Sequence, residues 1–374
     1  MSCRAHSRRL ELMTAHLARS FAQGFRTCLL AGVFSAGLLG SAELTLPSTV
    51  RGQAPSTPLT TWAVTIVLPP KVVAGQPATF AALGVDGRLA SDVIVDVGGQ
   101  KVTTDRTGRG HFTAPASGSY LLAKTPGGSS AALVDSAPPA SGSQAIAVAP
   151  VISLHDRFSI CGTGLSGEAD LNRVEINNQP TLVLAASPEC IVVLPGPKVT
   201  PGSATISVVA PGLQASATAA IVSLEFEPPN PALLPGKQGN LAVRVQGSEE
   251  RLQLIVENET PGVLRFLKGD AQEVVTGGGS QNLAGIRVQA ITSGDFSFHA
   301  RLVSAPDVEA ARRYLEAAAG LAPEDLRAEI KELARRLARH PRDLEKVARA
   351  LDGIRSTTMA GDFRTLLDAA SDAL

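Results

Sequence analysis

The chain has 374 residues, equal numbers of basic and acidic side chains, and only 4% aromatic residues. A neutral chain without a basic patch interleaved with aromatic residues argues against a nucleic-acid partner. The length predicts two to four domains, and Val, Ile, Leu and Ala must fill their cores because aromatic residues are so few. This composition suits several small sandwich domains better than one large enzyme fold.

Residues 1–42 have the pattern of a secretory signal peptide. Five arginines precede an apolar run of about 13 residues, which is shorter than the roughly 20 residues needed to span a bilayer. Gly40, Ser41 and Ala42 then offer a small-residue cleavage site. The sequence therefore predicts export, with the mature chain beginning near Glu43. Two alternatives stay open: the segment is retained as an uncleaved anchor, or Met13 rather than Met1 is the true start.

A flexible linker and a first β-domain follow the signal. Residues 43–61 are rich in Pro, Ser and Thr, as in flexible linkers. Residues 62–135 contain short β-branched runs separated by turn signals such as Asp86-Gly87 and Gly98-Gly99. Strands at this spacing predict an immunoglobulin-like β-sandwich. Residues 136–143 are again linker-like.

Residues 93–115 contain a recognisable sequence motif within this first domain. A strand ends at Gly98-Gly99 and is followed by Asp105, Gly108 and Phe112 at fixed offsets. The segment resembles bacterial immunoglobulin-like and carboxypeptidase-regulatory-like surface modules. We expect Asp105 to start a turn through its side-chain acceptor, because no cluster of oxygen ligands that would hold Ca²⁺ accompanies it.

Residues 149–222 contain an ordered series of motifs. Their members are a Pro150-initiated strand, Gly162-Thr-Gly164-Leu165, a strand from Ile191 to Pro195, and Pro201-Gly202 before a final hairpin. This series resembles the IPT/TIG domain, the immunoglobulin-like fold of plexins and transcription factors. The resemblance implies a sandwich of about 75 residues without catalytic residues.

Cys161 and Cys190 are the two cysteines that remain after removal of the signal, which takes Cys3 and Cys28 with it. An even cysteine count in an exported chain indicates a disulfide, and two buried free thiols are the alternative. In the IPT/TIG pattern both cysteines fall on outward positions of neighbouring strands. That placement predicts a bond on one face of a sheet rather than through the core.

Two further regions complete the chain. Residues 223–305 alternate in polarity between glycine-rich turns and predict a third β-sandwich of immunoglobulin size. Residues 306–374 change to Ala, Leu, Arg and Glu and predict a helical tail with apolar stripes at helical spacing. The main stripes are Leu326, Ile330, Leu333 and Leu337, and then Leu344, Val347, Leu351 and Ile354. We expect the tail to pack on itself or on the third sandwich; the alternative is a dimerisation or docking element.

The sequence shows no pattern typical of a reaction centre. The histidines of the mature chain lack metal-ligand spacing, and Gly162-x-Gly164 lacks the third glycine of a dinucleotide fingerprint. The acidic pairs Glu249-Glu250 and Glu257/Glu259 are expected on solvated faces rather than across a cleft. We therefore predict no catalytic, cofactor-binding or metal-binding residue and no enzyme activity. Cys161 and Cys190, as a disulfide, are the predicted site residues.

The fold class expected is mainly β: tandem immunoglobulin-like β-sandwiches followed by a C-terminal α-helical region. Such a chain fits a non-enzymatic, extracytoplasmic binding, adhesion or structural display protein. The alternative function is an accessory carbohydrate-binding or envelope-assembly subunit of a polysaccharide or secretion system. Carbohydrate binding would need an exposed aromatic platform, which is hard to build with only Trp62, Tyr120 and Tyr314 beside the phenylalanines. A protein or glycan ligand, envelope association and self-association through the tail all stay open.

Overall fold

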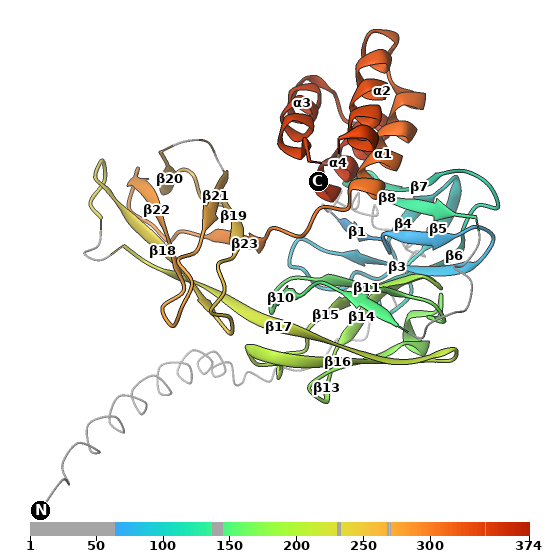
Figure 1. The fold of residues 1–374 in the computed structure, drawn as a ribbon, viewed down its shortest axis with the longest axis horizontal. Helices are drawn as coiled ribbons and strands as arrows, with labels where there is room; N and C mark the ends of the chain where they lie inside the picture. The colour runs from blue at the N-terminus through green and yellow to red at the C-terminus, as the bar shows by residue number, and fades with distance from the viewer. Residues whose placement is uncertain (1–63, 137–144, 230–232, 268, 270, 341) are drawn as a thin grey trace, which may run out of the picture. The chain divides into compact units, whose positions relative to one another are not determined.

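The computed structural model describes residues 64–136, 145–229, 233–267, 269, 271–340 and 342–374. The predicted signal peptide, the linker at 43–61 and nearly all of the linker-like segment at 136–143 lie outside these residues. Within them the fold is mainly β, with sandwich layers followed by four helices (Figure 1). The fold class predicted from the sequence is confirmed.

The first sandwich is built from eight short strands. They are β1 (Thr65–Val67), β2 (Lys71–Val73), β3 (Pro77–Leu83), β4 (Ile94–Val97), β5 (Gln100–Thr103), β6 (Arg109–Thr113), β7 (Tyr120–Thr125) and β8 (Gly128–Asp135). A five-stranded sheet in the order β2-β8-β7-β4-β5 packs on β1, β3 and β6, with Phe80 and Phe112 between them. Asp105 starts the turn before β6, as predicted: its Oδ1 accepts hydrogen bonds from the Thr107 and Arg109 amides.

The second sandwich shares a sheet with the first. Its strands are β9 (Ile146–Val148), β10 (Val151–Ser153), β11 (Phe158–Gly162), β12 (Arg173–Ile176), β13 (Gln179–Pro180), β14 (Leu182–Ala186), β15 (Cys190–Leu194), β16 (Gly202–Ala210) and β17 (Leu213–Glu227), with a 3-10 turn η1 (Ala169–Leu171). Strand β14 pairs with β3 at Ala186 and Thr79, so β1-β3-β14-β15-β11-β9 is one continuous path. The first two sandwiches are therefore joined through backbone pairing.

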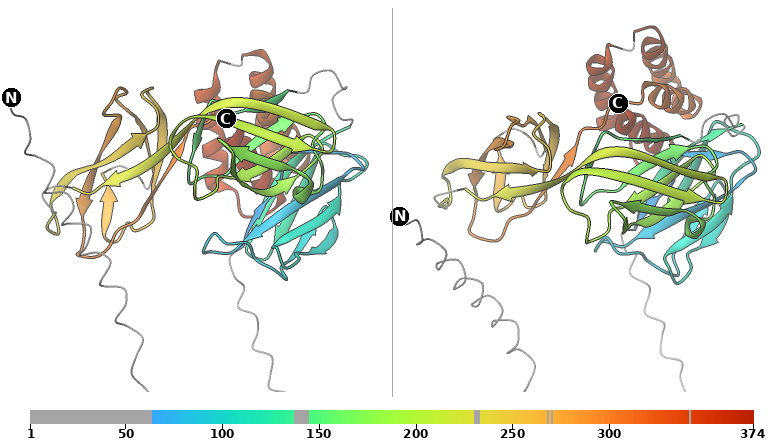
Figure 2. Two further views of the ribbon diagram at one scale, coloured as in Figure 1. Left: turned by 90° about the horizontal axis from the view of Figure 1, so that it is seen from below. Right: turned by 60° about the horizontal axis from the view of Figure 1, so that its bottom comes forward.

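Strand β17 joins the second sandwich to the third. It pairs with β16 along its first part and with β18 along its last part, and Figure 2 shows it running from one sandwich into the other in both views. Ile221 packs in the core of the second sandwich, whereas its neighbour Val222 packs in the core of the third. Successive side chains of a strand point to opposite faces, so one strand serves two cores.

The third sandwich is completed by β18 (Gln238–Gln246), β19 (Gln253–Asn258), β20 (Leu264–Phe266), β21 (Ala271–Val275), β22 (Leu283–Ala290) and β23 (Phe298–Leu302). Strands β17-β18-β22-β20 form one layer and β21-β19-β23 the other. Phe298 lies at the centre of their core, where its ring stacks on that of Phe266, 5.3 Å away.

The tail consists of α1 (Val308–Leu321), α2 (Glu324–Arg339), α3 (Leu344–Thr357) and α4 (Asp362–Ala373). Asp307 caps α1 by accepting a hydrogen bond from the Ala310 amide at 2.9 Å. The predicted stripes are buried against one another, and the same apolar cluster includes Leu122 and Leu133 of the first sandwich. None of the helices in the described part of the chain is long and apolar enough to cross a membrane.

The tail packs on itself, as expected, but the sandwich that it also contacts differs from our expectation. The tail covers β7 and β8 of the first sandwich rather than the third sandwich, because residues on the outer face of those strands are apolar. Leu122 and Leu133 face the helices, whereas Leu121 and Val134 face the sandwich core. A strand that is buried on both faces has consecutive apolar residues, and β7 and β8 each contain such a run.

Candidate functional site

The disulfide lies between two adjacent strands of the shared sheet. Cys161 of β11 is the register partner of Cys190 of β15, and their Cα atoms are 4.1 Å apart. The Gly162 amide donates to the Glu189 carbonyl, which places the cysteines at a non-hydrogen-bonded pair, where side chains approach most closely. The bond therefore staples neighbouring strands on one face of the sheet.

Both cysteines point away from the core of the second sandwich, as expected, but this face of the sheet is largely covered, and Cys161 is half-buried. Cys190 is fully buried, because the first sandwich covers the outer face of β14 and β15. Val67 and Ala81 of the first sandwich pack there against Leu184 and Val192 of the second. Strand alternation predicts which face a side chain takes but cannot show what covers that face.

Loss of the disulfide is expected to lower the free energy of unfolding by about 3 kcal/mol, because the bond closes a loop of about 30 residues. Urea unfolding of the oxidised protein and of the double variant Cys161→Ala/Cys190→Ala would measure the difference. A reducing agent should destabilise the wild type and leave the double variant unchanged. Equal stability of the wild type with and without reductant would contradict this expectation.

A buried arginine also joins the first two sandwiches. Arg109 of β6 is 7% exposed, and its guanidinium donates to Asp170 Oδ1 at 2.7 Å and to the Val183 carbonyl at 2.6 Å. Nearby, the Thr79 hydroxyl donates to the Gly167 carbonyl at 2.7 Å. The Asp170 side chain is exposed, so the buried part of this junction is the hydrogen bond from Arg109 to the Val183 carbonyl and that from Thr79 to the Gly167 carbonyl. Removing either donor would leave a buried carbonyl without its partner, which is costly.

Four charged side chains meet where the second sandwich, the first sandwich and the tail come together. They are Lys71 of β2, Asp135 of β8, Glu189 in the turn between β14 and β15, and Arg313 of α1. Arg313 pairs with Asp135 at 2.5 Å and also donates to the Val134 carbonyl at 2.8 Å. Burial, and then the adjacent Asp135 carboxylate, raise the pKa of Glu189 to about 7.

A cavity of about 840 Å³ adjoins this charged cluster, which we call the junction cluster. Its wall includes Lys71 and Leu133 of the first sandwich, Phe158 of the second, and Tyr314 and Asp372 of the tail. Cavities of this size between domains are common ligand sites. Desolvation by the surrounding protein raises the pKa of Asp372, although part of its side chain remains exposed to solvent.

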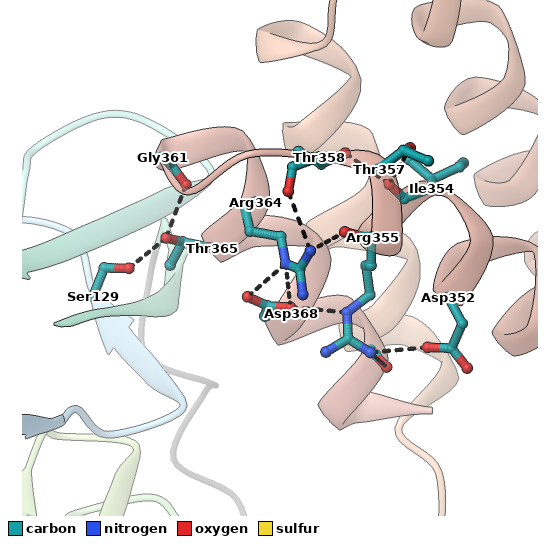
Figure 3. Close-up of polar contacts among 11 residues, drawn as sticks. Ser129, Asp352, Ile354, Arg355, Thr357, Thr358, Gly361, Arg364, Thr365 and Asp368 are labelled. Atoms are coloured by element: carbon teal, nitrogen blue, oxygen red, sulfur yellow. Dashed lines mark hydrogen bonds and ion pairs between the residues drawn. The ribbon is translucent and has the colours of Figure 1, made fainter. Parts of the chain in front are cut away.

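The wall contributed by the tail is held by an arginine network (Figure 3). Asp368 accepts hydrogen bonds from Arg355 Nε at 2.8 Å and from Arg364 Nε at 2.9 Å. Thr365 contacts the Ser129 hydroxyl of the first sandwich at 2.6 Å and donates to the Gly361 carbonyl. These contacts fix the connection between α3 and α4 and the side of α4 that faces the cavity.

The residues screened in the sequence for chemistry are not assembled into a reaction centre. His111 lies 2.8 Å from Glu168, His299 lies 3.6 Å from Asp156, and Glu257 lies 3.5 Å from Arg301. In the described ranges no group of three or more His, Cys, Asp or Glu side chains could hold a metal ion.

Arg109, Asp135, Glu189 and Arg313 are not identifiable as functional residues from the sequence alone. Each contacts residues that are distant in the sequence, so no local pattern reveals it. Only Arg109 has a local feature that could have drawn attention to it. It lies between Gly108 and Gly110, and glycines on both sides indicate that other segments of the chain approach the backbone closely there. Gly110 lies against the Phe80 ring, where a Cβ would come within 2.3 Å.

Comparison with known proteins finds similar solved structures but no matching protein family. No family model and no curated protein matches the chain. One similar structure is SGBP-B of the Bacteroides ovatus mixed-linkage glucan utilization locus, solved with a mixed-linkage heptasaccharide. It is 13% identical, with 63% of this chain and 72% of that chain covered and a TM-score of 0.23.

Two further similar structures are those of plexin A4 and Dscam1. The plexin A4 extracellular region is 14% identical, with 63% of this chain and 22% of that chain covered and a TM-score of 0.24. The four N-terminal immunoglobulin domains of Dscam1 isoform 6.9 are 10% identical, with 63% and 73% covered and a TM-score of 0.19. All three TM-scores are below 0.5, so these similarities do not identify a function for this chain.

Proposed function

We propose that this chain is an exported, non-enzymatic binding or display protein of a bacterial cell surface or periplasm, and that its second sandwich is an IPT/TIG domain. The observation that carries the proposal is the continuous connection of three sandwiches through shared sheets, reinforced by a disulfide. Such a connection suits a rigid scaffold that presents loops, and a disulfide persists in oxidising compartments.

The alternative is an accessory carbohydrate-binding or envelope-assembly subunit. Sugar rings are commonly bound on exposed aromatic side chains, whose apolar faces stack on them. Every Phe and Tyr among the described residues is buried or half-buried. This distribution favours protein binding or display over a glycan platform in that part of the chain.

Export is tested by intact-mass measurement and cell fractionation. The full chain with a C-terminal epitope tag, produced in a bacterium with a periplasm, is expected outside the cytoplasm with a mature mass that begins near Glu43. A display role predicts that the tagged protein co-sediments with the envelope. As a matched control, deletion of residues 28–40 should keep the protein in the cytoplasm with Cys161 and Cys190 reduced.

Different results would point elsewhere. Retention of residues 13–42 would indicate an N-terminal anchor, and a cytoplasmic full-length protein with free thiols would contradict the proposal. Binding to a glycan array by the purified protein would favour the carbohydrate-binding alternative.

A further inference from the structure

The junction cluster holds one carboxyl group without a charge partner of its own. Arg313 is committed to Asp135 and to the Val134 carbonyl. Glu189 Oε2 is buried and has no hydrogen-bond partner. Glu189 is half-buried as a residue, but a negative charge on this buried oxygen would lack a hydrogen-bond donor and would be repelled by the Asp135 carboxylate.

The charged groups around Glu189 come from every element packed against it. Asp135 of β8 repels a negative charge on Glu189, whereas Lys71 of β2 and Arg313 of α1 attract it. Glu309 of α1 also interacts with Lys71 and Arg313, so both cations are shared with a further acid. Burial and Asp135 outweigh the two cations, so the pKa of Glu189 is raised and its neutral form is favoured below about pH 7.

The second sandwich contacts the junction cluster through the turn that contains Glu189. The Ser187 hydroxyl donates to the Lys71 carbonyl at 2.6 Å, which joins the turn to β2. The Cys190 amide donates to the same Ser187 oxygen at 3.0 Å, and the disulfide joins Cys190 to β11. A change at Glu189 is thus transmitted to β2 on one side and to the stapled strands on the other.

We propose that Glu189 is a proton-operated latch between the second sandwich and the unit formed by the first sandwich and the tail. With its proton, Glu189 can donate a hydrogen bond toward Asp135, and the turn stays closed. Without its proton, the two carboxylates repel, and the turn separates from β2 and β8. Because Lys71 and Cys161 also line the cavity, opening the latch loosens the cavity wall.

The direction of the pH effect follows from the raised pKa of Glu189. The ordinary pKa of a glutamate is near 4.5, and in the closed junction the pKa is about 7. The closed form therefore has its full stability below about pH 4.5, loses stability as the pH rises, and has lost this contribution above about pH 7. The latch is closed in acid and loosened at neutral to alkaline pH.

Hydrogen exchange of the full chain tests the latch. After correction for the intrinsic exchange rate, the amides of Ser187, Glu189 and Cys190 should open about tenfold more often at pH 8 than at pH 5.5 in the wild type. Glu189→Gln, which resembles the protonated side chain, should show the same opening at both pH values. The matched control Glu175→Gln removes a carboxylate of the second sandwich that is paired with Arg173, and it should keep the wild-type pH dependence.

A second variant keeps the test independent of Glu189 itself. Lys71→Gln removes a cation that lowers the pKa of Glu189, so the midpoint of opening should move to higher pH. If Lys71 only stabilises the turn, opening increases at every pH and the midpoint is unchanged. A higher midpoint supports the latch, and a lower or unchanged midpoint overturns it. Equal pH dependence in the wild type and Glu189→Gln also overturns it. Since the readout is local opening in purified protein, failure would leave the proposed export and display role intact.

Discussion

Replacing Leu333 with aspartate is expected to unfold the helical tail and expose the sheet that the tail covers. Leu333 is 7% exposed and belongs to the apolar cluster that joins the helices to Leu122 and Leu133. The change removes a buried leucine and places a charge in its site, at a cost of more than about 4 kcal/mol. That is a large fraction of the stability of an ordinary domain. Far-UV circular dichroism and limited proteolysis of the tail would measure the loss.

Ala328→Asp is the matched control for this substitution. Ala328 lies on the same helix but is exposed, so it receives the same side chain without burying it. Its expected cost is below about 1 kcal/mol, from helix propensity alone. Equal melting curves for Leu333→Asp and Ala328→Asp would show that the stripe on α2 is not a packing surface.

Replacing Gly167 with alanine is expected to weaken the junction between the first two sandwiches. A Cβ at Gly167 would lie 1.9 Å from the Pro77 carbonyl oxygen, which belongs to the backbone at the start of β3. The loop must move away, and the hydrogen bond from Thr79 to the Gly167 carbonyl would be lost. Such overpacking costs about 3 kcal/mol or more. Urea unfolding would show a lower midpoint for the first two sandwiches.

The control for this second substitution is Gly262→Ala in the third sandwich. A Cβ there meets no atom within 4 Å, so a change close to zero is expected. If Gly167→Ala unfolds at the same urea concentration as the wild type, the loop at Gly167 does not press against β3, and the two sandwiches are not in close contact there.

The helices and most strands followed from side-chain periodicity. The stripe from Leu326 to Leu337 predicted the second helix, and the observed α2 spans Glu324–Arg339. The disulfide followed from cysteine counting combined with export, and it pairs Cys161 with Cys190. Periodicity and composition are local properties of the sequence, so they predict these elements without knowledge of contacts between distant residues.

The boundary between the second and third β-regions shows where local reading stops. Turn signals and alternation suggested a new region at Ser223, but β17 continues through that position to Glu227. Ile221 and Val222 have equally apolar side chains, and nothing local to them shows that they enter different cores. The division of the chain into domains at 222 and 223 stays a prediction, with one strand crossing it.

Composition and periodicity are enough to predict a mainly β protein with a helical end, two cysteines available to pair, and apolar stripes on the tail that must be buried. Which surface buries those stripes depends on the folded chain, because an apolar face is complementary to any other apolar face. The first sandwich, not the third, receives the tail, and it also buries Cys190. The junction cluster was likewise undetermined, since Lys71, Asp135, Glu189 and Arg313 are distant in sequence. Their charges acquire a shared effect only when folding removes them together from water.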